Sequence, residues 1–276
     1  MLRPNEVKRK LAAGEEVHGL FGVIPDPAVT EMIGHAGYDF VILDTEHTLV
    51  GPERLEHLIR AAETCGLTPF VRVPEGDPGA VLRALDAGAM GIVVPHVRGR
   101  ADIDATVRAA RYAPEGMRSL NGGRGPGYGT LPLPEYLAAA NDAVMVIALI
   151  EDAKGVDALD AVLTGGGVDL VLPGPGDLSQ SYGVPWQVRH PRVREAVRTV
   201  RAACARHGVP FCAMATTEER RHDWRSDGVT AFVLGEDRDI ISRALRGHRG
   251  WRRDSDGPGV ALSLSRCSGI QRDTHH

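Results

Sequence analysis

Short apolar runs alternate with longer amphipathic segments along almost the whole chain. One example is the run 40–44, which is followed by 52–65, where Leu55, Leu58 and Ala62 recur at helical spacing. The predicted strands are 18–24, 40–44, 69–73, 92–96, 144–150, 170–172, 210–215 and 231–234. The predicted helices are 26–36, 52–65, one starting at 77, 101–110, 136–140, 155–163, 191–207, 217–226 and 239–247. This alternation predicts parallel strands joined by crossover helices.

Eight such strand and helix units fit within the 276 residues. The expected fold is therefore α/β, a (β/α)8 TIM barrel. A doubly wound dinucleotide-binding sheet is less favoured, because no G-x-G-x-x-G motif follows an early strand. We expect a single catalytic barrel domain at 1–249, and a flexible tail at 250–276 because periodicity is lost there.

Charge and cysteine content exclude several classes of protein. The net charge of −4 provides no sequence-wide basic field, so nucleic acid and anionic membranes are not expected partners. No apolar run approaches the roughly 20 residues that span a membrane. The cysteines lack the spacing of a zinc site or a disulfide framework, which favours the cytoplasm. They are Cys65, Cys204, Cys212 and Cys267.

Chemically reactive side chains follow the predicted strands where each strand ends. Because the carboxyl ends of barrel strands meet at one face, we expect these side chains to converge there. The two later acids end the runs VMVIALIE and LVLPGPGD, each an apolar strand that terminates on a lone carboxylate. The set comprises Asp44, Glu46, His47, Arg72, His96, Glu151 and Asp177.

This set is suited to metal-assisted chemistry. Glu151 and Asp177 together favour a hard divalent cation such as Mg²⁺ or Mn²⁺. Arg72 would add positive charge where an enolate develops, and His47 could move a proton. Plainer interpretations stay open: both acids could cap helices, Asp44 could orient a loop, His47 and His96 could lie on the surface, and Arg72 could form a local salt bridge.

A Gly/Pro/Arg-rich passage from Tyr112 to Pro134 is too long for an ordinary connection. Its polar residues could bind an acidic or polar acceptor, in their own subunit or a neighbouring one, or they could belong to a solvated lid. They are Arg118, Asn121, Arg124 and Tyr128.

Six segments, in this order and spacing, resemble the HpcH/HpaI family of class II metal-dependent pyruvate aldolases: FVILDTEH, PFVRVPEGD, LDAGAMGIVVPHV, ARYAPEGMRS, LIEDAKGVDALD and LPGPGDLSQSYG. The resemblance covers about Gly14 to Leu245. It implies a barrel of the phosphoenolpyruvate/pyruvate-binding type, a divalent metal (Mg²⁺, Mn²⁺ or Co²⁺), and a homo-oligomer, either a hexamer or built from dimers.

The resemblance also implies roles for individual residues. Glu151 and Asp177 would bind the metal, and Arg72 would contact the keto oxygen of pyruvate and its enolate. His47 would act as acid/base, with Asp86 as its relay partner. The substrate would also contact Asp44, Arg124 and the backbone N–H groups of Gly176 and Asp177.

Two stretches depart from the family pattern. Leu149 stands where the family often has Gln, and the loop Ser119 to Gly129 differs from the usual aldolase sequence. The leading hypothesis is a carbon–carbon lyase that forms a pyruvate enolate and cleaves or makes 4-hydroxy-2-oxo acids with an aldehyde. The alternatives are a diverged synthase that uses oxaloacetate or another keto acid, as in citrate formation or natural-product assembly, and a non-catalytic barrel that binds a keto acid.

Overall fold

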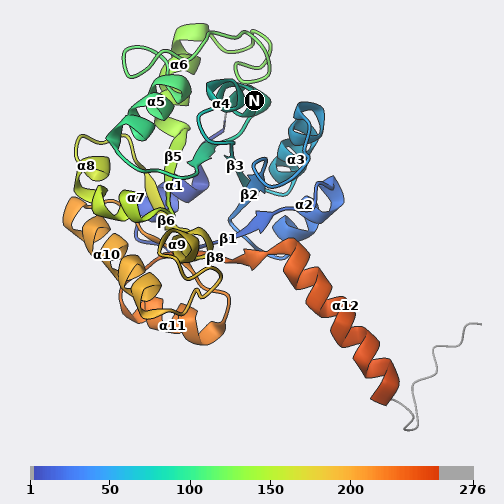
Figure 1. The fold of residues 1–276 in the computed structure, drawn as a ribbon. Helices are drawn as coiled ribbons and strands as arrows, with labels where there is room; N and C mark the ends of the chain where they lie inside the picture. The colour runs from blue at the N-terminus through green and yellow to red at the C-terminus, as the bar shows by residue number, and fades with distance from the viewer. Residues whose placement is uncertain (1–2, 255–276) are drawn as a thin grey trace, which may run out of the picture. The chain divides into compact units, whose positions relative to one another are not determined.

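The computed structural model describes residues 3–254, and the side chains of residues 3–250. Eight parallel strands alternate with helices (Figure 1). The strands are β1 Val17–Gly22, β2 Phe40–Asp44, β3 Thr68–Arg72, β4 Gly91–Val94, β5 Met145–Ile150, β6 Leu170–Pro173, β7 Cys212–Met214 and β8 Ala231–Glu236. The helices are α1 Glu6–Ala12, α2 Pro27–His35, α3 Pro52–Thr64, α4 Pro78–Ala87, α5 Arg100–Ala110, α6 Leu133–Ala143, α7 Ala153–Asp157, α8 Leu159–Leu163, α9 Pro175–Ser181, α10 Pro191–His207, α11 Glu218–Ser226 and α12 Asp237–Asp254.

The sheet closes on itself to form a barrel. Its hydrogen-bonded strand order is β6-β5-β4-β3-β2-β1-β8-β7. A parallel bridge between Val171 and Phe211 joins the two end strands, and the N–H of Val171 donates to the carbonyl of Pro210 at 3.0 Å. The expected (β/α)8 barrel is therefore confirmed.

Apolar side chains of the strands fill the interior of the barrel. The rings of Phe40 and Phe70 contact each other in a tilted arrangement, 5.4 Å between centroids, and they lie in one buried cluster with Leu149 and Leu172. Residues buried on both faces of a strand explain why the strands read as continuous apolar runs. The side chain of Val7, from α1, joins the same cluster and covers the end where the strands begin.

Local sequence accounts for most of the helix ends. The carboxylate of Asp77 caps α4 by accepting from the N–H of Ala80 at 2.9 Å, and Gly88 ends the helix with a left-handed φ of 110°. Such a φ carries no steric penalty only at glycine. Helix α12 was expected to stop at Gly247, but it continues to Asp254, because glycine weakens a helix interior without ending it.

The chain divides into two compact units, the first comprising Met1–Asp239 and the second starting at Ile240. All eight strands lie in the first unit. Residues 250–254, which we expected in a flexible tail, are helical, and the rest of that expected tail lies outside the described residues. The single domain expected over 1–249 stays a prediction.

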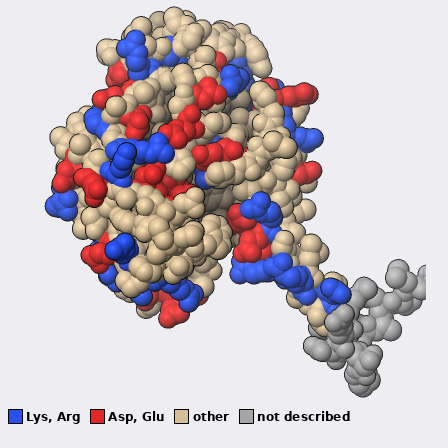
Figure 2. Space-filling view, in the orientation of Figure 1, with Lys and Arg blue, Asp and Glu red and all other residues tan. Residues whose placement is uncertain are grey.

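Charged side chains of both signs are intermingled over the barrel face shown in Figure 2, whereas basic ones gather along α12. Within residues 3–254, no helix has the length and apolar character needed to cross a membrane.

Candidate active site

Strands β2 and β3 bring an acid and an arginine together at the carboxyl end of the barrel. Asp44 and Arg72 are direct neighbours in the sheet register. The guanidinium donates from Nε to Oδ1 of Asp44 at 3.0 Å and from Nη2 to Oδ2 at 2.7 Å. Burial alone would raise the pKa of Asp44, but this ion pair and the N–H groups of Glu46 and His47 hold it below its usual value. The aspartate therefore remains charged and fixes the arginine in one orientation.

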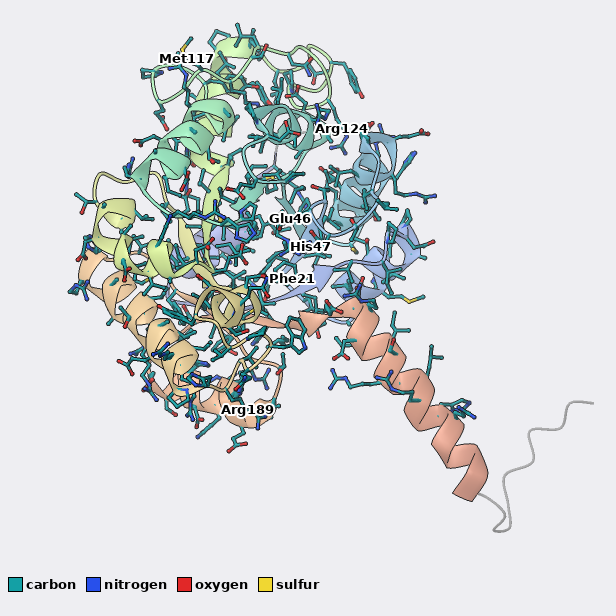
Figure 3. All side chains as sticks on the ribbon, in the orientation of Figure 1. Phe21, Glu46, His47, Met117, Arg124 and Arg189 are labelled. Atoms are coloured by element: carbon teal, nitrogen blue, oxygen red, sulfur yellow. The ribbon has the colours of Figure 1, made fainter. Side chains whose placement is uncertain are left out.

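Glu46 lies beside this pair with an oxygen that has no hydrogen-bond partner. Its Oε2 is buried, 3.4 Å from Nε of Arg72 and 3.7 Å from Nε2 of His47. The guanidinium also lies over the ring of Phe21, 5.0 Å from its centroid. Figure 3 shows Glu46, His47 and Phe21 gathered near the middle of the barrel. A buried carboxylate oxygen that accepts no hydrogen bond marks this place as a candidate site, because such atoms are costly to maintain.

The loop after β4 contributes to the environment of Glu151, which follows β5 and is 3% exposed. The backbone N–H of His96 donates to Oε1 of Glu151 at 2.9 Å. This approach places His96 at a φ of 50°, in the left-handed region. Its ring nitrogen Nδ1 lies 3.0 Å from Oδ2 of Asp152, and Nε2 lies 3.9 Å from Oε1 of Glu46.

Burial raises the pKa of Glu151 to about 7. The hydrogen bond and charge of His96 oppose this shift, and the negative charge of Asp177 adds to it. The charge of Asp177 therefore acts on Glu151 across the carboxyl end of the barrel. Neither residue caps a helix through its side chain, although Asp177 is an acid in the first turn of α9, which was the other plain interpretation of this residue.

The turn between β6 and α9 supplies Asp177. The residue lies in the first turn of α9, where its exposed carboxylate makes no hydrogen bond or ion pair with the described residues. No side chain caps this helix, so the N–H groups of Gly176 and Asp177 are free for an anion. A Cβ at Gly174 would lie 2.6 Å from Oε2 of Glu151, so only glycine leaves room for that carboxylate.

The Gly/Arg-rich loop does not reach this site within one chain. Arg118 pairs with Asp86 of α4 at 2.7 Å, and Asn121 donates to the same carboxylate at 3.0 Å. Arg124 pairs with Glu63 at the end of α3 and donates to the carbonyl of Ala87 at 2.9 Å. Both helices end where strands begin, at the opposite end of the barrel. Figure 3 shows Arg124 well away from Glu46 and His47.

Asp86 is therefore not joined to His47 by any hydrogen bond or ion pair in the described chain, where His47 contacts Glu46 instead. The roles of Asp86 as relay and of Arg124 in substrate binding stay predictions. Leu149, where the family often has Gln, is buried in the barrel interior and offers no polar group beside Glu151.

Sequence reasoning assigned no role to two residues that the structure brings into the site, Glu46 and His96. Both belong to the set of strand-end residues that the sequence indicated, so their position was expected although their contacts were not. For His96 a surface position was one of the open alternatives, and the structure instead places its backbone against Glu151. Its contact with Glu151 uses a backbone N–H, which has no signature in the sequence.

The residues present fit a divalent cation. Glu151 and Asp177 have oxygens without hydrogen-bond donors, and hard cations such as Mg²⁺ are commonly bound by one or two carboxylates, with water and substrate completing the shell. The described residues contain no cluster of three or more His, Cys, Asp or Glu side chains arranged for a metal. A cation here would therefore keep open positions for a substrate.

The fold and this mouth define a class: a (β/α)8 barrel enzyme whose acids and arginine converge at the carboxyl ends of the strands. Comparison with known proteins narrows the class. The model of the HpcH/HpaI aldolase/citrate lyase family matches residues 18–244, and the chain belongs to this family. It is an enzyme, a carbon–carbon lyase of the aldolase class, and the family uses a divalent metal.

Individual relatives are similar over nearly their whole length. The 5-keto-4-deoxy-D-glucarate aldolase of Salmonella paratyphi A is 32% identical over 235 residues, which cover 85% of this chain and 91% of the relative. The crystal structure of the citrate synthase SbnG is 41% identical with a TM-score of 0.84, covering 90% of this chain and 97% of that one. An HpcH/HpaI family protein from Burkholderia cenocepacia is 32% identical with a TM-score of 0.85, covering 90% and 99%.

Proposed function

We propose that the chain makes or cleaves 4-hydroxy-2-oxo acids by forming the enolate of pyruvate, with an aldehyde as the second partner. The observation that carries this proposal is the arrangement at one barrel mouth of two carboxylates with free oxygens, Glu151 and Asp177, and the half-buried guanidinium of Arg72. The aldolases among its relatives support the same reaction class.

Glu151 and Asp177 would hold Mg²⁺, Mn²⁺ or Co²⁺. When bound, such an ion supplies Lewis-acid polarisation of the substrate's keto oxygen. The free N–H groups of Gly176 and Asp177 would bind the carboxylate of the keto acid, because an uncapped helix start attracts anions. Gly174 leaves the space in which the Glu151 carboxylate turns toward that substrate.

Arg72 would stabilise the negative charge that develops on the keto oxygen as the enolate forms. The bidentate contact with Asp44 holds the guanidinium in place before the substrate arrives. A donor that is already oriented does not have to be reorganised during the reaction, which is the main source of electrostatic catalysis. Asp44 thus acts on the substrate through Arg72.

His47 would move the proton between the substrate and solvent. Its side chain is 60% exposed, and Nε2 lies 3.7 Å from Glu46, so the imidazole can reach both water and the site. Asp86 and Arg124 lie at the other end of the barrel, so they would take their predicted roles from a second copy of the chain. This requirement agrees with the expected homo-oligomer. The soluble, cytoplasmic setting expected from the cysteines completes the proposal.

Exchange of the pyruvate methyl protons in deuterated water, followed by NMR, tests the enolate step without an acceptor. We expect exchange that stops with EDTA and returns with Mg²⁺ or Mn²⁺. Glu151→Gln and Asp177→Asn should each abolish it, whereas Glu31→Ala, a substitution on the exposed face of α2, should not change it. Exchange that persists in the two site variants, or without metal, would refute the proposal. Complete absence of exchange from the metal-loaded wild-type enzyme would also refute it.

A second candidate is a synthase that applies the same chemistry to oxaloacetate or another keto acid. It is favoured by the 41% identity to a citrate synthase, compared with 32% to the aldolases. Leu149 and the altered loop also depart from the aldolase pattern. Incubation with oxaloacetate, with and without an acceptor or acetyl donor, separates the two: a tricarboxylate product indicates the synthase. Decarboxylation alone does not decide, because an enolate-stabilising site can cause it as a side reaction.

A further inference from the structure

Trp186 lies in the connection between α9 and α10 and has an unusual combination of exposure and backbone strain. Its side chain is 82% exposed, and its φ of 63° lies in the left-handed region. A bulky residue in that region is strained, and such strain persists where the surrounding structure imposes it. The surrounding structure therefore holds this exposed tryptophan in a defined position.

Hydrogen bonds on both sides of Trp186 impose this conformation. The N–H of Val184 donates to the carbonyl of Ser179 at 2.8 Å, which ties the segment to the end of α9. The N–H of Gln187 donates to the carbonyl of Val184 at 3.0 Å and closes a turn around the tryptophan. The His190 N–H then donates to the Gln187 carbonyl at 2.8 Å. The indole is therefore presented from an anchored turn.

The indole lies against the turn that carries Asp177. A Cβ at Gly176 would be 3.2 Å from Cζ3 of Trp186 and 3.9 Å from Cε3. The six-membered ring thus covers one side of Gly176, whose N–H group is a proposed contact of the keto acid. The rest of the ring is exposed, and its Nε1–H makes no hydrogen bond with the described residues. A molecule that approaches the keto acid past Gly176 would meet this surface.

We propose that Trp186 contacts the acceptor aldehyde and determines acceptor specificity. The inference rests on the proposed aldolase function. The exposed indole favours acceptors that carry apolar surface next to the aldehyde carbon, because burying that surface against the ring is favourable while a small hydrated aldehyde gains little. Removing the ring should cost about tenfold in kcat/KM for an apolar acceptor, as is typical of hydrophobic contacts in specificity pockets.

The test uses full-length, metal-loaded enzyme and the variants Trp186→Ala and Trp186→Phe. Arg189→Ala is the matched control, because Arg189 is exposed on the same connection, has no hydrogen bond or ion pair among residues 3–254, and lies away from Glu46 and His47 in Figure 3. Two activities are measured: pyruvate proton exchange without acceptor, and kcat/KM for addition of pyruvate to butanal and to glycolaldehyde.

We expect Trp186→Ala to lower kcat/KM for butanal about tenfold, with less than about a threefold change for glycolaldehyde and for proton exchange. Trp186→Phe should restore most of the butanal activity, and Arg189→Ala should resemble wild type. The ratio between the two aldehydes is measured on one sample, so it does not depend on the fraction of variant that folds.

An unchanged aldehyde ratio in Trp186→Ala would overturn the inference. Equal losses for exchange and for both aldehydes would also overturn it, since the ring would then support the keto-acid turn instead. Wild-type enzyme without exchange would refute the proposed function and this inference with it. Normal wild-type exchange with an unchanged ratio would refute only the role of Trp186.

Discussion

At the scale of single residues, the buried carboxylate of Glu151 links metal binding to pH. Its pKa is raised to about 7 by burial, with a further contribution from the charge of Asp177. A carboxylate must lose its proton to bind a cation, so protons and metal compete at this residue. Without a bound cation, burial therefore disfavours the charged form of this carboxylate.

We predict that metal affinity rises by about tenfold per pH unit below pH 7 and levels off above it. Isothermal titration with Mn²⁺ between pH 5.5 and 8.5, in buffers of different ionisation enthalpy, should show release of about one proton at the low end. Glu151→Gln should bind weakly and lose this dependence. Wild-type affinity that does not vary with pH would contradict the raised pKa.

The raised pKa of Glu151 also makes the free energy of unfolding depend on pH. The pKa of Glu151 in the folded chain, about 7, lies above the ordinary 4.5, so the folded state binds more protons between these values. Its contribution to the free energy of unfolding is present below pH 4.5 and is lost as the pH rises toward 7. A bound cation would offset this loss by neutralising the carboxylate.

At the scale of elements, the turn from β6 into α9 shapes the site through Gly174. Replacing it with alanine would place a Cβ 2.6 Å from Oε2 and 2.7 Å from Cβ of Glu151, and would displace that side chain. The φ of −105° suits alanine, so the effect comes from space and not from the backbone.

We therefore predict that Gly174→Ala lowers metal affinity and the pyruvate exchange rate about tenfold or more, a size typical of changes that misplace a metal ligand. Gly51→Ala is the matched control, because it also precedes a helix, has a φ of −77°, and has no atom within 4 Å of its Cβ position. Titration with Mn²⁺ and the exchange assay measure both effects. A Gly174→Ala variant with normal affinity and exchange would show that Glu151 has room to adjust.

Among the elements, the strands follow from local sequence far better than the short helices do. Strands β2, β4, β5 and β6 are buried on both faces and consist of apolar runs, and the capping residues Asp26 and Asp77 mark the starts of α2 and α4. Helix α9 was not expected, because PGDLSQS contains a proline, a glycine and small polar residues. It depends on packing of Leu178, which is fully buried. The single helix expected at 155–163 is instead two short helices, α7 and α8.

At the scale of the whole molecule, the two ends of the barrel have separate tasks. The carboxyl ends of the strands carry the candidate site, whereas α1 closes the other end. The side-chain amide of Asn5 donates to the carbonyls of Met90 at 3.1 Å and Ala143 at 2.8 Å, just before β4 and β5 begin. Its Oδ1 accepts from the N–H of Lys8 at 3.1 Å and caps α1.

We predict that Asn5→Ala lowers the free energy of unfolding by about 2 kcal/mol, since it removes the donor to the Ala143 carbonyl, one of two donors to the Met90 carbonyl, and a helix cap. Urea unfolding followed by circular dichroism measures this loss. The exchange rate per folded molecule should not change, because the site lies at the other end. Glu31→Ala should alter stability by less than about 0.5 kcal/mol. A loss of activity without a loss of stability would contradict this division.

The sequence by itself determined the barrel and the set of polar residues at its mouth, because apolar runs in alternation with helices admit few folds and parallel strands end at one face. Only the tertiary structure decided which residues contact one another. Asp44 pairs with Arg72, the N–H of His96 donates to Glu151, and the indole of Trp186 lies against Gly176. Asp86 and Arg124 form their ion pairs at the opposite end of the barrel. The residues in each of these contacts are not neighbours in the sequence. Such contacts depend on strand register and loop docking, which local periodicity does not encode.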